Sequence, residues 1–352
     1  MNKRGKILVI GAAVLVVLIA AVSFASNWFF IKLVTGNGFA MSTYIDQQVY
    51  TKNLSRGNAI INDTMSALKR FEDRLSMFDS DSEIAKINQN AGVSFVAVSA
   101  HTFELLQKTV SYCELSGGLF DITIAPVTQA WGISGDSPRV PAKDELETLK
   151  TLVNYKDILF DEQTSSVMLR NKGQAIDLGA VAKGEACNIV RDLYLQNEVQ
   201  AGLLSIGGNI LVVGQKPKTG GFVIGVRDPR GAQNEVIGTI RLTDEVLSTS
   251  GDYERVFEQN GLRYHHIMDP ATAAPAETDL MSVTVVCEDG AYADFFSTYL
   301  FLLGRDAVIE KMHAMDIGIV AVDKQYNVYI SPGLHEPFTK AENSAYTYHL
   351  IG

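Results

Sequence analysis

Cysteine and basic residues are scarce in this sequence, and each scarcity argues against a class of protein. The chain has 3 cysteines among 352 residues, far apart and with no pair at metal-ligand spacing. We interpret Cys113, Cys187 and Cys287 as buried small hydrophobic residues, and none lies near the N-terminus, where a lipid could be attached. The net charge is −10, with no block of Lys and Arg after residue 6. This composition argues against nucleic-acid binding, because the chain has no cluster of positive side chains after residue 6 to neutralise a phosphate backbone.

Two common phosphate-binding signatures are also missing. A Walker loop requires Ser or Thr after Gly-Lys, whereas residues 183–185 have the order Lys-Gly-Glu. Residues 36–38 have the order Gly-Asn-Gly, but the third glycine of a dinucleotide fingerprint does not follow. The sequence therefore supports neither a P-loop nor a Rossmann fold.

A long apolar run follows a basic N-terminus. Residues 1–6 carry three positive charges, residues 7–25 are almost wholly apolar, and the next charged residue is Lys32. Such a run just spans a bilayer, and Trp-Phe-Phe at 28–30 suits the far interface. We expect residues 1–33 to be an uncleaved signal anchor, although Ser-Phe-Ala at 23–25 also suits cleavage of a secretory signal peptide. In both cases the domain predicted for residues 34–352 lies outside the cytoplasm.

Apolar periodicity after the N-terminal segment predicts helices and strands, without a repeat or a linker, so one domain is the simpler interpretation. The predicted helices cover residues 60–77, the short stretch around 84–87, 103–113 and a segment that begins at Ala293. The predicted strands cover residues 203–206, 222–227, 236–242, 281–286, 317–322 and 326–330.

Residues 176–184, Ile-Asp-Leu-Gly-Ala-Val-Ala-Lys-Gly, precede an amphipathic run over 185–195. An acid, a glycine turn and a lysine at the start of a helical pattern bring backbone N–H groups, a helix dipole and an ammonium group together. Such a place suits an anion such as a diphosphate. The alternative is an ordinary strand, turn and capped helix in a core.

Four further segments carry groups that could form a site. The apolar run 118–127 lines a cavity or fills a core, and the hydroxyl-rich run 246–253 favours a tight turn over oxygen recognition. Adjacent His265 and His266 face opposite ways on an extended segment, so at most one points into a site. Asp294 and Thr298 are four residues apart on a helix and can meet one hard cation, although most such pairs are solvated.

Together these segments resemble the ApbE-type FAD:protein FMN transferases, from about residue 38 to 333. The resemblance implies a single α+β domain with a mixed β-sheet and flanking helices, and a bacterial enzyme outside the cytoplasmic membrane. It also implies Mg²⁺-dependent cleavage of FAD, transfer of FMN through its phosphate to a Thr or Ser hydroxyl of an acceptor protein, such as a subunit of a membrane redox complex, and release of AMP. Six motifs occur in the family's order: residues 118–121, 176–184, 207–209, 250–253, 266–270, and Ala293-Asp294 with Thr298.

The resemblance also implies roles for single residues. We hypothesise that His266 is the general base and that His265 is structural or exposed. Two departures from the family are mild, since Phe78 replaces the usual Tyr and Met268 the more common Ile. Two alternatives stay open: an FAD pyrophosphatase that uses water, and a flavin-binding protein without turnover. The residues expected at the FAD site are Met41, Phe78, Leu119, Phe120, Asp121, Asp177, Lys183 and Met268, and those at the metal are Asp294, Thr298 and the carbonyl of Ala180.

Overall fold

The structure is a computed structural model that describes residues 31–232, 234–342 and 344–352. The apolar segment over residues 7–25 lies outside these ranges, so its assignment as an anchor or a signal stays a prediction. Within them, none of the helices combines the length and the apolar character that a membrane span requires. The first strand, β1, begins at Lys32, two residues before the predicted start of the domain.

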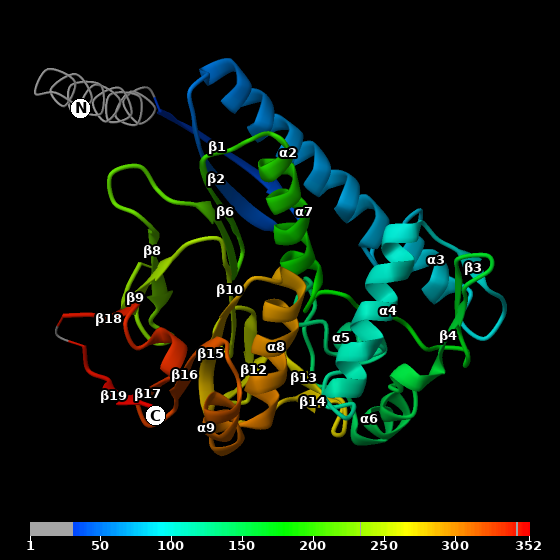
Figure 1. Cartoon of the computed structure of the whole chain (residues 1–352). Coiled ribbons are helices and arrows are strands. Elements are labelled where there is room, and N and C mark those ends of the chain that lie inside the picture. The colour runs from blue at the N-terminus through cyan, green and yellow to red at the C-terminus, as the bar shows by residue number, and fades with distance from the viewer. Residues whose placement is uncertain (1–30, 233, 343) are drawn as a thin grey trace, which may run out of the picture.

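A nine-stranded mixed sheet forms the centre of the molecule (Figure 1). Its strands follow one another in chain order, and each neighbouring pair is antiparallel except the last, β17 and β19. The strands are β1 (Lys32–Ala40), β2 (Thr43–Thr51), β6 (Ala201–Ile206), β7 (Asn209–Gly214), β10 (Val246–Gly251), β15 (Leu280–Cys287), β16 (Gly318–Asp323), β17 (Asn327–Ile330) and β19 (Thr347–Leu350).

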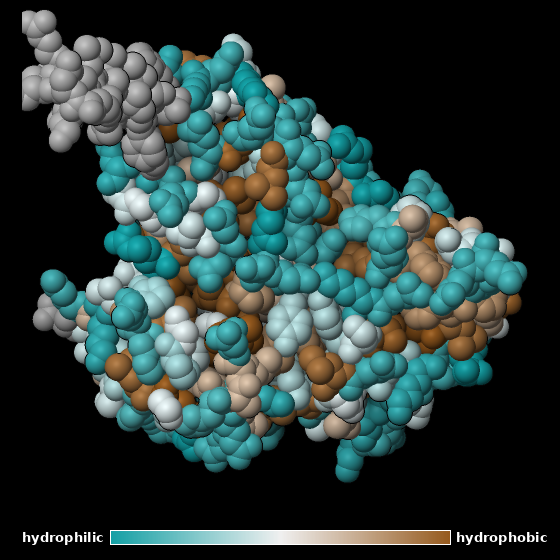
Figure 2. Space-filling view, in the orientation of Figure 1, coloured by the Kyte–Doolittle hydropathy of each residue, from teal (hydrophilic) through white to brown (hydrophobic). Residues whose placement is uncertain are grey.

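One face of this sheet is covered by helices. α2 (Leu54–Leu75) is capped by Asn53, whose side chain accepts hydrogen bonds from the backbone N–H groups of Ser55 and Arg56. Its apolar stripe, which includes Leu68 and Phe71, is buried in the main core, while its outer surface is mainly hydrophilic (Figure 2). The other helices that complete this layer are α7 (Ala182–Gln196), α8 (Gly290–Leu303) and α9 (Arg305–Ala314).

The opposite face of the sheet is covered by a second, three-stranded sheet. Its strands, in the order β18-β9-β8, are β8 (Phe222–Arg227), β9 (Val236–Leu242) and β18 (Phe338–Lys340). Along β8, Phe222, Ile224 and Val226 are buried and the alternate residues are exposed. This period of two produces a second core between the sheets, separate from the core under the helices.

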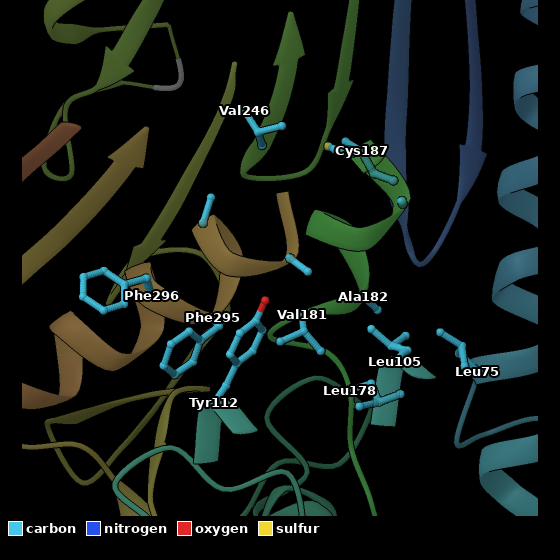
Figure 3. Packing of buried hydrophobic residues seen from close by; sticks show 14 of the residues in the cluster. Leu75, Leu105, Tyr112, Leu178, Val181, Ala182, Cys187, Val246, Phe295 and Phe296 are labelled. Carbon is cyan, nitrogen blue, oxygen red and sulfur yellow. The ribbon is translucent and has the colours of Figure 1, made fainter. Parts of the chain in front are cut away.

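A third group of elements extends the helical side and forms one wall of the pocket described below. Figure 3 shows Tyr112 of α4 beside Phe295 of α8, and their rings stack with centroids 4.6 Å apart. The elements of this group are α3 (Glu83–Gln89), β3 (Val96–Ala97), α4 (Ala100–Leu115), α5 (Ala125–Trp131), α6 (Lys143–Lys150), a 3₁₀ turn at Tyr155–Asp157, β4 (Ile158–Asp161) and β5 (Ser166–Leu169). Two short hairpins, β11 (Val256–Gln259) with β12 (Leu262–His265) and β13 (Met268–Asp269) with β14 (Ala274–Pro275), and a 3₁₀ turn at Pro332–Leu334 complete the described elements.

The structure confirms a mixed sheet with flanking helices, and it corrects several local predictions. The run that we expected to form a turn is central strand β10 up to Gly251. The helix expected to begin at Ala293 begins at Gly290, because Asp289 caps it. Ile176 is not in a strand, and Cys287 is only half-buried, unlike Cys113 and Cys187.

Two glycines allow α7 and α8 to cross in close contact. A Cβ atom added at Gly184 would overlap the backbone oxygen of Gly290 and lie 2.7 Å from Cβ of Asp294. A Cβ atom added at Gly290 would overlap the backbone oxygen of Gly184 in return. The crossing therefore requires glycine on both helices, and it places Asp294 beside the first turn of α7.

We expect Gly184→Ala to lower the free energy of unfolding by about 1–3 kcal/mol, because backbone on both helices must move to admit the methyl group. Chemical denaturation measures this loss. The matched control is Gly333→Ala, since a Cβ atom there has no neighbour within 4 Å. Equal stability of the two variants would show that the crossing can relax at no cost.

Candidate active site

A pocket of about 650 Å³ lies at the end of the central sheet that carries the β1–β2 and β6–β7 turns. The N-terminal part of α7, the inner face of α8 and the segment after β12 complete its wall. The structure therefore brings together all twelve residues that the sequence analysis selected, whereas their individual roles stay predictions. They are Met41, Phe78, Leu119, Phe120, Asp121, Asp177, Ala180, Lys183, His266, Met268, Asp294 and Thr298.

Asp294 supplies a buried carboxylate to this wall. It is 4 % exposed, its Oδ2 accepts a hydrogen bond of 2.9 Å from the Gly184 N–H, and its Oδ1 accepts one of 3.1 Å from the Ser248 hydroxyl. A carboxylate has about four lone-pair sites, so each oxygen keeps one for a ligand. Thr298 lies one turn further along α8, with its Oγ1 3.0 Å from the Ser250 hydroxyl oxygen.

The carbonyl of Ala180 lies outside the hydrogen-bond ladder of α7, which begins at Ala182. The Gly184 N–H, in the first turn of that helix, donates to Asp294. Within the described ranges, no backbone amide donates to the Ala180 carbonyl. The pocket wall thus offers three kinds of oxygen, from a carboxylate, a hydroxyl and a carbonyl, which is the ligand chemistry that Mg²⁺ prefers.

This oxygen set contains a single acid. In the part of the chain that the structure describes, no cluster of three or more His, Cys, Asp and Glu side chains is arranged to hold a metal ion. The three oxygens fit a Mg²⁺ ion that keeps waters and substrate phosphates as its other ligands. They do not fit a metal held by protein side chains alone.

The stretch 176–184 forms a loop that leads into α7, and its polar groups bond to one another. Asp177 Oδ1 accepts from the Gly179 N–H at 2.8 Å, and its Oδ2 accepts from the Thr128 hydroxyl at 3.3 Å. Lys183 Nζ donates to the Gly179 carbonyl at 2.9 Å. The N-cap residue Val181 makes no side-chain hydrogen bond, but the Ala182 N–H donates to the Leu178 carbonyl and the Gly184 N–H donates to Asp294. Of the predicted first-turn donors, the Lys183 N–H is therefore the one without an acceptor among the described residues, and Lys183 lines the pocket.

Asp121 lines the pocket, but its carboxylate holds the wall together. Oδ1 accepts from the backbone N–H and the hydroxyl of Thr123 at 2.8 and 2.6 Å, and Oδ2 accepts from the Tyr155 N–H at 2.8 Å. Burial raises the pKa of this carboxyl, and these hydrogen bonds oppose the rise. The rings of Phe120 and Phe295 pack edge to face, whereas Leu119 is half-buried. We therefore expect a ligand to contact Leu119 more than Phe120.

Three apolar side chains lie at different depths of the pocket. Phe78 is 79 % exposed at the rim, so its ring is available to a planar ligand. Met41 lies in the β1–β2 turn with φ of 53°. Met268 is buried deeper, in the small core around Trp131.

The two adjacent histidines have different surroundings, as the sequence predicted. His265 bonds through Nε2 to the Ala276 carbonyl at 3.0 Å and accepts through Nδ1 from the Ile267 N–H, so it has a structural position. His266 is half-buried and lines the pocket, and its Nδ1 is enclosed without a hydrogen-bond partner among the described residues. Desolvation, then the charges of Lys183 and Arg255, lowers the pKa of His266 to about 3.

Sequence reasoning missed an ion pair that fixes the segment after β10. Arg230, in the turn between β8 and β9, donates two hydrogen bonds of 2.7 Å to the two carboxylate oxygens of Asp252. Arg227 lies over the ring of Tyr253, 4.9 Å from its centroid. The motif 250–253 suggested a site, but nothing in its spacing identified an arginine from the second sheet as its partner.

We expect Arg230→Ala to lower the free energy of unfolding by about 1–3 kcal/mol, because Asp252 would stay buried without its partner. Thermal and chemical denaturation measure the loss. Arg56→Ala serves as the control, since its partner Glu198 is 82 % exposed and such pairs contribute little. Similar losses in the two variants would contradict a special role for the Arg230 pair.

Comparisons with known proteins identify the family of this chain. A family model described as the ApbE family matches residues 41–321. A Klebsiella pneumoniae (strain 342) protein named FAD:protein FMN transferase is 32 % identical over 284 residues, which cover 80 % of this chain and 88 % of that protein. A Treponema pallidum (strain Nichols) protein of the same name is 30 % identical over 295 residues, covering 79 % and 82 %.

The fold agrees as well. The crystal structure of the ApbE protein from Thermotoga maritima superimposes with a TM-score of 0.80 at 33 % identity, over 86 % of this chain and 97 % of that chain. The match to the family model extends from the β1–β2 turn to β16, so it includes all twelve residues selected for the candidate site. The chain therefore belongs to the ApbE family.

Proposed function

We propose that this protein is an FAD:protein FMN transferase, the activity named for its relatives in Klebsiella pneumoniae and Treponema pallidum. The reaction breaks the P–O–P bond of FAD, joins the FMN phosphorus to a Thr or Ser hydroxyl oxygen of an acceptor protein, and releases AMP. The observation that supports it most is the pocket itself. One cavity holds an oxygen set suited to Mg²⁺, an ammonium group at a helix N-terminus and an exposed aromatic ring.

The residues of the chain would divide the work of binding the diphosphate. Asp294, Thr298 and the Ala180 carbonyl would hold Mg²⁺, which when bound offsets the negative charge that develops on the diphosphate and on AMP. Lys183, through its ammonium group and its backbone N–H in the first turn of α7, would contact the same phosphates. Phe78 and Met268 would contact the rings of FAD, and the buried wall around Phe120 would exclude water from them.

His266 is the residue that we propose to accept the proton of the acceptor hydroxyl. Its ring is at the pocket, and Nδ1 is enclosed, so Nε2 is the nitrogen that a ligand can reach. The proton would move from the hydroxyl to Nε2 as the new phosphorus–oxygen bond forms, and from there to the leaving phosphate of AMP or to solvent.

The test is incubation of the full-length protein with FAD, Mg²⁺ and a candidate acceptor protein, with the acceptor mass and the released AMP measured together. We expect the acceptor to gain the mass of FMN less one water, in equal amount to AMP. Free FMN and AMP without an acceptor adduct would identify an FAD pyrophosphatase instead. Bound FAD without any AMP would identify a flavin-binding protein without turnover.

We further propose that residues 1–33 keep the protein on the outer face of a bacterial cytoplasmic membrane. The basic residues before the apolar run and the aromatic residues after it support an anchor with its N-terminus in the cytoplasm. We expect the native protein to sediment with membranes and to be released by detergent but not by high salt. A soluble product that begins near Ser26 would show that the segment is a cleaved signal.

A further inference from the structure

A chain of buried polar side chains runs from Asp294 away from the pocket into the central sheet. The Ser248 hydroxyl oxygen is 3.1 Å from Asp294 Oδ1 and 3.1 Å from Asn209 Oδ1. Ser248 in β10 and Asn209 in β7 are paired across the sheet, and they are 0 % and 1 % exposed. A third contact of Ser248, to the Ser297 hydroxyl oxygen, is longer at 3.4 Å.

Counting protons fixes the direction of these hydrogen bonds. A serine hydroxyl has one proton, whereas an ionised carboxylate oxygen and an amide oxygen can only accept. Ser248 therefore cannot donate to both Asp294 and Asn209. The Asn209 nitrogen, Nδ2, is meanwhile buried without a partner. The first conflict disappears when the amide is turned by 180°, so that Nδ2 donates to Ser248 and Ser248 donates to Asp294. The buried amide atom without a partner is then an oxygen and no longer an N–H donor.

We infer that Ser248, supported by Asn209, is a positioning residue for the carboxylate of Asp294. The Gly184 N–H fixes one oxygen of this carboxylate and Ser248 fixes the other, so the plane of the group is set before any cation arrives. Each oxygen keeps a further lone pair, and Asp294 lines the pocket. This inference rests on the proposed function, in which Asp294 holds Mg²⁺.

The geometry distinguishes this role from simple filling of the core. A serine that only fills a β-strand position needs a single acceptor, and a valine or an alanine would serve the packing between the sheet and α8 equally well. Here the hydroxyl, the amide and the carboxylate are all buried, so the loss of one member leaves another without a partner. Replacing a residue that hydrogen-bonds a metal ligand typically weakens metal affinity about 10–100-fold.

The test compares Ser248→Ala, the nearly isosteric Ser248→Cys, Asn209→Ala and the control Ser331→Ala in the full-length protein. Ser331 is also 0 % exposed and hydrogen-bonded, but it does not line the pocket. Two quantities are measured: the dissociation constant of Mn²⁺ alone by calorimetry, and the Mg²⁺ concentration that gives half-maximal AMP release. The melting temperature is recorded for each variant, so that loss of stability is separated from loss of cation binding.

We expect Ser248→Ala to raise the dissociation constant of Mn²⁺ and the half-maximal Mg²⁺ concentration about 10–100-fold each. Most of the rate of AMP release should be restored at saturating Mg²⁺. Ser248→Cys and Asn209→Ala should show smaller shifts in the same direction, because a thiol is a weak donor and Asn209 acts through Ser248. Ser331→Ala should lower the melting temperature alone. Should Ser248→Ala and Ser248→Cys behave as Ser331→Ala does, the positioning role is wrong.

The failure of the proposed function would look different. Unmodified protein that releases no AMP from FAD would contradict the transferase itself. Asp294→Asn that binds Mn²⁺ as tightly as the unmodified protein would contradict the metal site, and the role of Ser248 with it. The positioning role alone is contradicted when the unmodified protein is active, Asp294→Asn loses cation binding, and the Ser248 variants keep a normal cation dependence.

Discussion

Asp294→Asn should reduce FMN transfer by at least roughly 10²–10³-fold while the protein stays folded. The amide has nearly the same shape as the carboxylate, and the surroundings can accept it. Its oxygen can take the hydrogen bond from the Gly184 N–H, and its nitrogen can donate to the Ser248 hydroxyl. What is lost is the negative charge, the only one among the three proposed ligands of Mg²⁺.

Asp294→Ala is a less informative variant than Asp294→Asn. It would leave the Gly184 N–H and the Ser248 hydroxyl buried without partners, at a cost of about 1–3 kcal/mol each. A loss of activity could then follow from local distortion of the α7–α8 crossing. The asparagine variant separates charge from packing.

The measurement is the initial rate of AMP release with acceptor and FAD, over a range of Mg²⁺ concentrations, together with the melting temperature. Thr298→Val provides a graded comparison, since it removes a neutral ligand at nearly constant volume, and we expect a smaller loss. Near-normal Mg²⁺-dependent turnover by Asp294→Asn would show that the cation is held elsewhere.

The amphipathic elements could be predicted from the sequence because each buries one side only. The predicted strands 222–227 and 236–242 coincide with β8 and β9, and in β8 buried residues alternate with exposed ones. The stripe of α2 was predicted from Leu68, Phe71 and their neighbours, although the helix starts six residues earlier than expected, at Leu54. In these elements the spacing of apolar residues matches the residues that are buried, so the sequence pattern alone is sufficient to predict them.

Strand β1 could not be predicted, because two of its inward positions, between buried Val34 and Ala40, are glycines. Gly36 and Gly38 face α2, and a Cβ atom at either would overlap or closely approach Ile61 or Met65. Close packing of helix on sheet thus removed the alternation that identifies a strand. Strand β10 was mistaken for a turn for a related reason, since Ser248 and Ser250 bond to polar groups of α8 where a core strand would carry apolar residues.

The members of the site followed from motifs, but their couplings did not. Asp294 and Thr298 could be paired from helical spacing. The partners of Asp294, however, are Gly184 and Ser248, which are 110 and 46 residues away along the chain. Only the fold shows that the Gly184 N–H, in the first turn of α7, donates to this carboxylate, and that the oxygens of Asp121 accept hydrogen bonds from the pocket wall.

His266→Ala should lower the rate of FMN transfer by about 10²-fold, the lower end of what general-base catalysis contributes. The reason for the lower end is the pKa of about 3, since so weak a base accepts a proton less readily than one matched to neutral pH. FAD affinity should change little. His265→Gln is the comparison: it should cost stability, because His265 bonds to Ala276 and Ile267, without a specific loss of rate.

The pKa also predicts how transfer and stability depend on pH. With its pKa lowered from 6.5 to about 3, the His266 ring is neutral in the folded protein from pH 9 down to pH 5. Because kcat/KM reports the free enzyme, its profile should show no inflection from His266 in that range. The unfolded chain binds the proton more readily, so the contribution of this ring to stability is complete above pH 6.5 and declines as the pH falls from 6.5 towards 3.

Single-turnover transfer by the unmodified protein, His266→Ala and His265→Gln between pH 5 and 9 decides among three mechanisms. A pH-independent loss confined to His266→Ala supports a ring that is always neutral and accepts the proton at Nε2. An inflection near pH 6.5 that disappears in His266→Ala would mean that the ring titrates normally, contrary to its surroundings of Lys183 and Arg255. Full activity of both variants would mean that neither histidine activates the acceptor hydroxyl. No other imidazole lines the pocket in the described part of the chain, so the activation would then depend on the cation proposed for Asp294, Thr298 and the Ala180 carbonyl.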